Sequence, residues 1–162
     1  MIHEVQGDIL LTKAQVIAHG VAANDPMKQG LALSLHERYP AMHKDFHHWC
    51  HQTRPKPGAA WVWGGVGGVR LVNLLTQEGG YGGGTQPGKA TLSHVKHALQ
   101  ALRKIIEKEG FTSLALPRLA TGVGEMDWAK VQPLIKSELG DLDIPIFVYV
   151  TYIAGRQAAE RF

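Results

Sequence analysis

The chain has 162 residues, 44% of them hydrophobic, which suffices for one core and excludes two comfortable domains, so we expect a single domain over residues 1–162. Its net charge of +3 suits an anionic ligand, but lysine and arginine are spread along the sequence rather than massed in a run typical of nucleic-acid binding. We expect a cytoplasmic protein without membrane contact, because the sequence shows neither a signal peptide nor an apolar run near the roughly 20 residues that cross a bilayer. The single cysteine, Cys50, predicts that there is no internal disulfide and agrees with a reducing compartment.

Six runs are typical of β-strands, because they are short, apolar or alternating, and bounded by glycine, proline or polar clusters. The first is expected at a sheet edge. In chain order the expected strands are residues 2–5, 16–19, 61–63, 70–75, 113–116 and 145–150.

Helices are expected between these strands. Apolar residues recur at steps of three and four over residues 92–106 and predict a helix that Gly110 ends. Residues 31–38 and 41–52 predict two further helices separated by Pro40, because proline lacks a backbone N–H and disfavours helical geometry in the residue before it.

A second proline interrupts the last helical stretch. Pro133 predicts that residues 128–132 form a separate turn, and that the helix proper has this proline in its first turn and runs to about Leu139.

Strands that alternate with helices predict an α/β fold, with a mixed, mostly parallel sheet covered on both faces in three layers. Ligands of such sheets lie at the carboxyl ends of the strands. Three segments of interest follow strands there, residues 20–30, 76–88 and 120–127. We therefore expect them to converge on one crevice.

The segment 116–128 runs from a strand pattern through a glycine loop into a helix start, which predicts an anion site. Glycine lets backbone N–H groups approach a phosphate closely, and the first helical turn adds unpaired donors and the positive end of the helix dipole. The alternative is a tight connection that binds nothing. The glycine-dense residues 77–88 are interpreted as a mobile loop over the site, with a linker between domains as the alternative.

Three motifs together resemble the macrodomain family, the ADP-ribose-binding α/β/α module. They are Gly7-Asp8-Ile9, the segment 18–24 with Met27 and residues 30–32, and the segment 116–128. The branch with the yeast-type ADP-ribose 1''-phosphate phosphatase and, more distantly, the terminal ADP-ribose glycohydrolases is most similar, through the loop histidine at position 19 and the stretches 38–45 and 75–80.

The resemblance implies the following ligand contacts. Asp8, next to Ile9, would accept a hydrogen bond from the adenine amino group and repel the guanine carbonyl, unless it only caps a turn. Tyr149, at the end of the last strand, would pack on adenine, with Tyr152 as second choice and a core role as the alternative.

The remaining implied contacts concern the diphosphate and the distal ribose. Thr121, Gly122, Val123 and Gly124 would offer backbone donors to the diphosphate. Asn24 and Gly30 would hold the distal ribose, although an asparagine in a loop often only braces backbone.

The resemblance also implies His19 as a catalytic residue beside the distal ribose, with a water positioned near Asn24. An imidazole titrating near neutral pH can protonate a leaving ribose oxygen or orient an attacking water, and the alternative is a histidine bonded to backbone. Glycohydrolases of the lysine-adduct type have a lysine and a carboxylate where this chain has Gln77 and Gly124. Lys89 or Lys28 could substitute for the amine, and Glu125 or Asp127 for the carboxylate.

His43, His47 and His51 are spaced four apart and would share one helix face, which raises a metal site as an alternative to a solvated or partly packed histidine face. Three histidines in a row on one helix cannot converge on one ion without ligands from elsewhere. We therefore expect no metal.

These patterns predict a monomeric macrodomain that binds ADP-ribose or a derivative and hydrolyses a group on the distal ribose, with ADP-ribose 1''-phosphate preferred and no metal or organic cofactor required. The alternatives are a glycohydrolase acting on ADP-ribosylated protein or nucleic acid, a reader without activity, and a structural domain whose loops bind nothing.

Overall fold

The computed structural model describes residues 1–82 and 87–162, and it contains all six expected strands. Their bounds are β1 Ile2–Gly7, β2 Val16–Ala22, β3 Ala60–Gly64, β4 Arg70–Gln77, β5 Leu114–Pro117 and β6 Ile146–Tyr152. They form one mixed sheet in the order β1-β6-β5-β2-β4-β3, in which β3 pairs antiparallel with β4 and the other neighbours pair parallel. The first strand lies at a sheet edge, as its short alternating pattern predicts.

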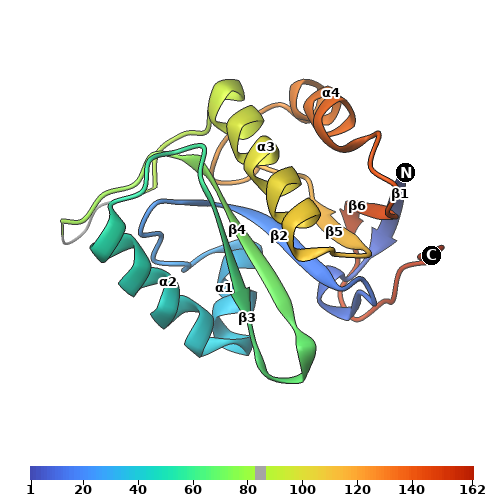
Figure 1. Ribbon diagram of the computed structural model, residues 1–162, viewed down its shortest axis with the longest axis horizontal. Coiled ribbons are helices and arrows are strands. Elements are labelled where there is room, and N and C mark those ends of the chain that lie inside the picture. Colours follow the sequence, from blue (N-terminus) through green and yellow to red (C-terminus); the bar gives the residue numbers. More distant parts are fainter. Residues whose placement is uncertain (83–86) are drawn as a thin grey trace.

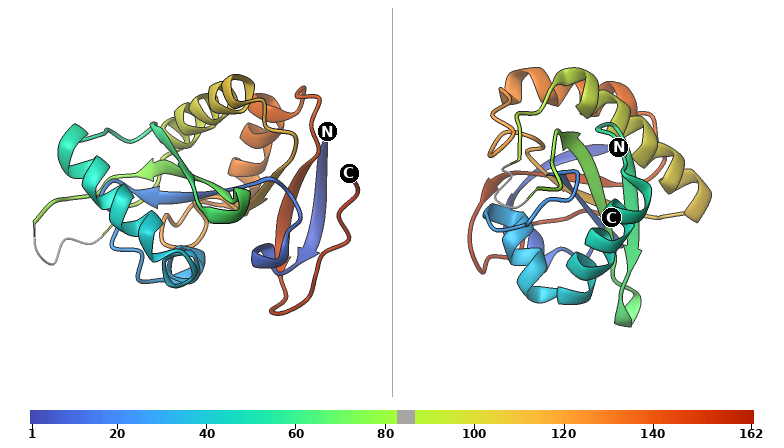
Figure 2. Two further views of the ribbon diagram at one scale, coloured as in Figure 1. Left: turned by 60° about the horizontal axis from the view of Figure 1, so that its bottom comes forward. Right: turned by 90° about the vertical axis from the view of Figure 1, so that its left-hand side faces the viewer.

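Four helices cover the two faces of the sheet. They are α1 Gly30–Arg38, α2 Pro40–Thr53, α3 Leu92–Glu109 and α4 Trp128–Leu139. Figures 1 and 2 show α3 and α4 on one side of the sheet and α1 and α2 on the other, and each pair packs on its own hydrophobic core. This arrangement confirms the predicted three-layer α/β/α fold.

Helix α3 buries the apolar face that its sequence period predicts. Val95, Leu99 and Leu102 are completely buried against the sheet. The Thr91 hydroxyl caps the first turn by accepting a hydrogen bond from a backbone N–H, and Gly110 ends the helix in the left-handed conformation at φ 67°. A residue with a Cβ would be strained there, so glycine sets the end of the helix.

The break between α1 and α2 falls at Pro40, as expected. Tyr39 leaves helical geometry at φ −129°, and Pro40 begins the next helix, where no intrahelical donor is required. Met42, Phe46 and Cys50 then form the fully buried face of α2.

The prediction for Pro133 is wrong, because α4 runs without a break from Trp128 through the proline to Leu139. The Asp127 side chain caps the helix by accepting a hydrogen bond from the backbone N–H of Ala129 at 3.1 Å. Val131 and its periodic partners are buried in the core. A good cap and a buried face outweigh the single donor that proline removes.

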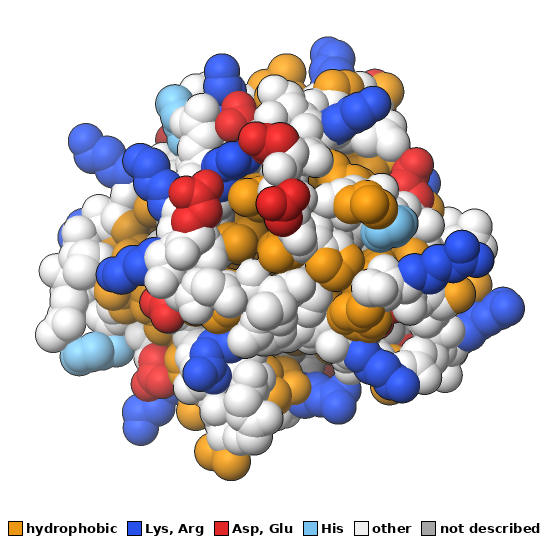
Figure 3. All heavy atoms as spheres, turned by 45° about the vertical axis from the view of Figure 1, so that its right-hand side comes forward, with side chains coloured by type: hydrophobic (Ala, Val, Ile, Leu, Met, Phe, Trp, Pro, Cys, Tyr) orange, Lys and Arg blue, Asp and Glu red, His pale blue; other side chains and the backbone are white. Residues whose placement is uncertain are grey.

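Two features bear on membrane contact and charge, namely the length and polarity of the described helices and the distribution of charge on one face of the surface. Within residues 1–82 and 87–162, no helix has the length and apolar character needed to span a bilayer. Lysine and arginine are interspersed with acidic side chains over the face shown in Figure 3.

Candidate functional site

A cavity of about 690 Å³ opens where the loops after β2, β4 and β5 meet. Its lining comes from the segments 19–32, 77–82 and 117–124, from Pro87, and from α1 and α2. Because parallel strands place their carboxyl ends at one edge, segments far apart in sequence meet there. The predicted convergence of three loops on one crevice is confirmed for the residues that the structure describes, and residues 83–86 of the glycine-dense segment lie outside them.

A smaller, mostly apolar slot of about 260 Å³ adjoins this cavity. Gly30, Leu31 and Pro117 line both spaces, so the slot and the cavity are neighbours that share part of their walls. Ile9 and Tyr152 also line the slot. An elongated ligand with a flat apolar end would fit this shape.

Asp8 follows β1 directly and lies beside the slot, between two residues that line it. Its carboxylate accepts hydrogen bonds from the backbone N–H of Leu10 at 3.0 Å and of Gly155 at 2.9 Å. The turn-capping role is therefore present in the structure. Each oxygen keeps a further lone pair, so a ligand contact is compatible with it.

Tyr149 lies inside β6 rather than at its end, because the strand continues to Tyr152. The Tyr149 ring is buried at 5% exposure, and its hydroxyl donates to Glu160 Oε2 at 2.8 Å. Burial, together with Glu160, raises the pKa of Tyr149. Tyr152, which is 66% exposed and also lines the slot, offers the more accessible ring.

The glycine loop after β5 forms a tight turn before α4. The backbone N–H of Met126 donates to Ala120 O at 2.8 Å, and Ala120 has φ 61°. Gly122, Val123 and Gly124 line the cavity.

Thr121 is predicted to face the ligand but is not among the residues that line the cavity. Its hydroxyl donates to Arg118 O at 2.9 Å and so supports the turn. At the N-terminus of α4, the Asp127 carboxylate accepts a hydrogen bond from the backbone N–H of Ala129, so one of the expected unpaired donors is already occupied.

The loop after β2 is braced by a residue that sequence reasoning missed. The Asp25 carboxylate accepts from the backbone N–H groups of Ala22 and Met27, both at 2.8 Å. Asn24, at φ 53°, donates from Nδ2 to Gly80 O at 3.1 Å and so connects this loop to the one after β4. An aspartate six residues beyond the expected strand 16–19, and three beyond the observed end of β2, is a signal for such a turn.

His19 lines the cavity and is 2% exposed. Its Nε2 donates to Asn73 Oδ1 at 2.7 Å, which leaves Nδ1 as an acceptor. Burial lowers the pKa of His19 to about 4, although Asn73 and Asp25 act in the opposite direction. The expectation of a ring that titrates near neutral pH is wrong, because burial keeps this imidazole neutral at that pH.

Gln77 and Gly124 lie side by side in the cavity wall, with Gln77 Nε2 donating to Gly88 O at 2.9 Å. Of the suggested substitutes, Lys28 lines the cavity. Lys89 and Glu125 form an exposed ion pair of 3.5 Å with each other.

The histidine face predicted on α2 extends to α1 and reaches the cavity. His36, His43 and His47 line it, and the rings of His36 and His43 stack with centroids 3.8 Å apart. His51 packs on Tyr81 instead. No group of three metal-ligating side chains is found in the described part of the chain. The role of His36 was missed because it lies on another helix.

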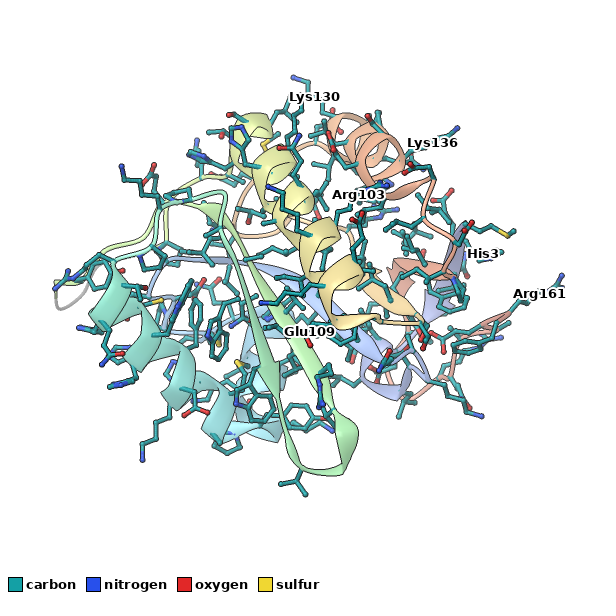
Figure 4. All side chains as sticks on the ribbon, in the orientation of Figure 1. His3, Arg103, Glu109, Lys130, Lys136 and Arg161 are labelled. Carbon is teal, nitrogen blue, oxygen red and sulfur yellow. The ribbon has the colours of Figure 1, made fainter. Side chains whose placement is uncertain are left out.

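Basic side chains of the opposite layer take no part in the site. Figure 4 shows Arg103, Lys130 and Lys136 on α3 and α4, and none of them lines the cavity. Arg103 is bound to Glu138 O at 2.9 Å and forms an ion pair with Asp141.

No family model matches the chain. It is 27% identical over 158 residues to the DNA ADP-ribosyl transferase-DNA ADP-ribosyl glycohydrolase fusion protein of Thermosipho africanus. This match covers 90% of this chain and 41% of that protein. It is 27% identical over 153 residues to the DNA ADP-ribosyl glycohydrolase of Mycobacterium tuberculosis, covering 91% of this chain and 42% of that protein. The chain therefore spans about two fifths of the length of these curated relatives.

Solved structures show the same fold. The macrodomain of Mycobacterium tuberculosis DarG has a TM-score of 0.82 at 24% identity and covers 92% of this chain and 97% of that one. Thermosipho africanus DarTG in complex with ADP-ribose has a TM-score of 0.81 at 20% identity and covers 96% of this chain and 42% of that one. These likenesses bear out the expected fold.

Proposed function

We propose that this chain, which has the macrodomain fold, binds ADP-ribose in the adjoining cavity and slot. The observation that supports the proposal most directly is that the two spaces adjoin at Gly30, Leu31 and Pro117, which line both of them. The apolar slot suits a purine, and the larger cavity with its glycine loops suits a diphosphate and a sugar. The complex of a structural relative with ADP-ribose agrees with this assignment.

In the proposed binding mode, adenine lies in the slot against Ile9 and Tyr152, with Tyr149 forming the buried floor. Asp8 accepts a hydrogen bond from the adenine amino group, which a guanine carbonyl could not donate. The carboxylate is held for this role by two backbone N–H groups.

The diphosphate is proposed to lie over residues 122–124, where backbone N–H groups of the glycine loop serve as donors. The distal ribose then reaches Asn24 in the loop after β2. Gly30, at φ 57° with open space where a Cβ would be, lets the backbone pass close to the ligand.

Calorimetry with ADP-ribose and with the guanosine analogue tests this binding mode. ADP-ribose should bind with a defined stoichiometry of one, and the guanosine analogue should bind at least about tenfold more weakly. At 100 times its Kd, ADP-ribose should also stabilise the fold by about 2.7 kcal/mol. No heat and no thermal shift at millimolar ADP-ribose would contradict the proposal.

A second candidate function is hydrolysis of a group carried by the distal ribose, with ADP-ribose 1''-phosphate as a substrate. Nδ1 of neutral His19 is an acceptor in the cavity wall and could orient a water molecule, and Asn24 lies in the same wall. Glycoside hydrolysis through a lysine adduct is not supported, because Gln77 and Gly124 stand where that route has its lysine nucleophile and its carboxylate. The similarity to DNA ADP-ribosyl glycohydrolases favours ADP-ribosylated DNA as the alternative substrate.

Purified protein incubated with each substrate separates these candidates. Phosphate release that is lost in His19→Ala supports the phosphatase, and ADP-ribose release from modified DNA supports the glycohydrolase. Binding of ADP-ribose without turnover of either substrate indicates a reader. If both the phosphate bond and the glycosidic bond stayed intact over many hours, both hydrolase candidates would be wrong.

A further inference from the structure

Two buried side-chain polar atoms in the described part of the chain have no hydrogen-bond partner, Asn24 Oδ1 and His43 Nε2. Both residues line the large cavity. A buried polar atom without a partner costs about 1–3 kcal/mol, and such atoms in native proteins usually meet a ligand or an ordered water. Because both residues line one cavity, a polar ligand group bound there could supply the missing partners.

The identity of the Asn24 atom defines what it binds. Asn24 Nδ2 donates to Gly80 O at 3.1 Å, and this bond fixes which end of the amide is the oxygen. The orphaned Oδ1 can only accept. Its partner must therefore carry a donor, as a sugar hydroxyl does and an ionised phosphate does not.

His43 is held in position from two helices. Its ring stacks on His36 with 3.8 Å between centroids and 21° between planes. His36 is itself tied to the loop after β2 by a contact from Nδ1 to Met27 O at 3.4 Å. On its own helix, His43 follows the completely buried Met42. Such a ring loses little further freedom when a ligand binds.

The charge of the ring also suits a hydroxyl. Burial lowers the pKa of His43, and His36 and His47 act in the same direction. A hydrogen bond of the ring to the Asp25 backbone and the charge of the Asp25 carboxylate act against them. A neutral imidazole can donate or accept one hydrogen bond through Nε2, depending on its tautomer. This matches an alcohol, which can do both.

We propose that His43 is a ligand-contacting residue, and that its Nε2 and Asn24 Oδ1 together bind hydroxyl groups of the sugar farthest from adenine. This inference rests on the proposed function and deepens it, because it names the group that distinguishes ADP-ribose from ADP. His43 thereby sets specificity for the sugar end of the ligand.

The test compares the Kd of ADP-ribose with that of ADP, which lacks the distal sugar. His43→Phe keeps a ring that can stack on His36 and removes both nitrogens. This variant should bind ADP-ribose about three- to tenfold more weakly, the range expected for one lost hydrogen bond, and should bind ADP within about twofold of the unaltered chain. His43→Leu serves as a second variant, for which the same pattern is expected.

His48→Phe is the matched control, because His48 is exposed on the same helix and is not part of the cavity lining. It should leave both affinities unchanged. Unaltered ADP-ribose affinity in the His43 variants, or equal losses for ADP and ADP-ribose, would overturn the inference while leaving the proposed function in place. If the unaltered chain bound neither nucleotide, the proposed function would fall as well.

Discussion

Oε1 of Gln77 lies 3.0 Å from the point that a Cβ atom would occupy at Gly124. These residues come from the end of β4 and the loop after β5, and they adjoin in the cavity wall. The macrodomain resemblance places the lysine and the carboxylate of the lysine-adduct glycohydrolases at these positions. The chain thus keeps two positions adjacent while neither side chain supplies a nucleophile or an acid.

Gly124→Ala should destabilise the fold by about 1–3 kcal/mol and weaken ADP-ribose binding, because an added Cβ would lie 2.7 Å from Ala120 O and 3.0 Å from Ala90 Cβ. Urea denaturation measures the loss. Gly122→Ala is the control, since nothing lies within 4 Å of the corresponding Cβ position. Similar stability of the two variants would show that the loop relaxes.

Asp8→Asn should destabilise the protein by about 1–3 kcal/mol. The carboxylate now accepts hydrogen bonds from two backbone N–H groups, and in the variant the amide nitrogen, which is a donor, would face one of them. Thermal denaturation in the absence of ligand gives this value. Asp143→Asn, at an exposed position, should change little. If both variants melted alike, the two backbone contacts of Asp8 would contribute nothing measurable.

The free energy of unfolding should fall as the pH is lowered from about 6.5 towards 4. The pKa of His19 in the folded chain is about 4, below the ordinary value of 6.5 expected in the unfolded chain, so the unfolded chain binds more protons in this window. Above pH 6.5 the contribution of neutral His19 to the free energy of unfolding is fully present. Its loss on acidification amounts to roughly 3 kcal/mol as an order of magnitude.

Urea denaturation as a function of pH measures this effect, and His19→Gln should flatten the slope. His48→Gln, which changes an exposed histidine, is the control. An unchanged slope in His19→Gln would assign the acid sensitivity to other groups.

Tyr152→Ala should weaken ADP-ribose binding about five- to tenfold with little loss of stability, because the ring lines the slot and is 66% exposed. Calorimetry and thermal denaturation together separate the two effects. Phe162→Ala removes an equally exposed ring outside the slot and should leave the affinity unchanged. Equal affinities in all three proteins would place adenine elsewhere.

Tyr149→Phe should cost about 0.5–1.5 kcal/mol of stability, since it removes the hydrogen bond of 2.8 Å to Glu160. It should change the Kd of ADP-ribose less than Tyr152→Ala does, because the ring itself is kept in the floor of the slot. Denaturation and calorimetry of the variant check both statements. The reverse order of effects on the Kd would restore Tyr149 as the main adenine contact.

Local patterns predicted the elements because each depends on nearby residues. The period of α3, the break at Pro40 and the end at Gly110 follow from backbone geometry and from which face is apolar. Pro133 misled the prediction because its effect depends on the cap at Asp127 and on core packing, which a local rule does not weigh.

The candidate site was predicted in outline and missed in detail. The loops and the resemblance located the crevice, but the protonation of His19 depends on burial beside Asn73, which lies on another strand. The stacking of His43 on His36 likewise joins two helices.

The amino-acid sequence alone determined the strands, most of the helix bounds, the layered fold and the three loops that follow parallel strands, because these depend on periodicity, glycine and proline. Only the tertiary structure decided which polar atoms lie buried without partners, which carboxylates are already occupied by backbone and which histidines are neutral. Those properties depend on water exclusion and on neighbours from distant segments, and they arise only when the chain is packed.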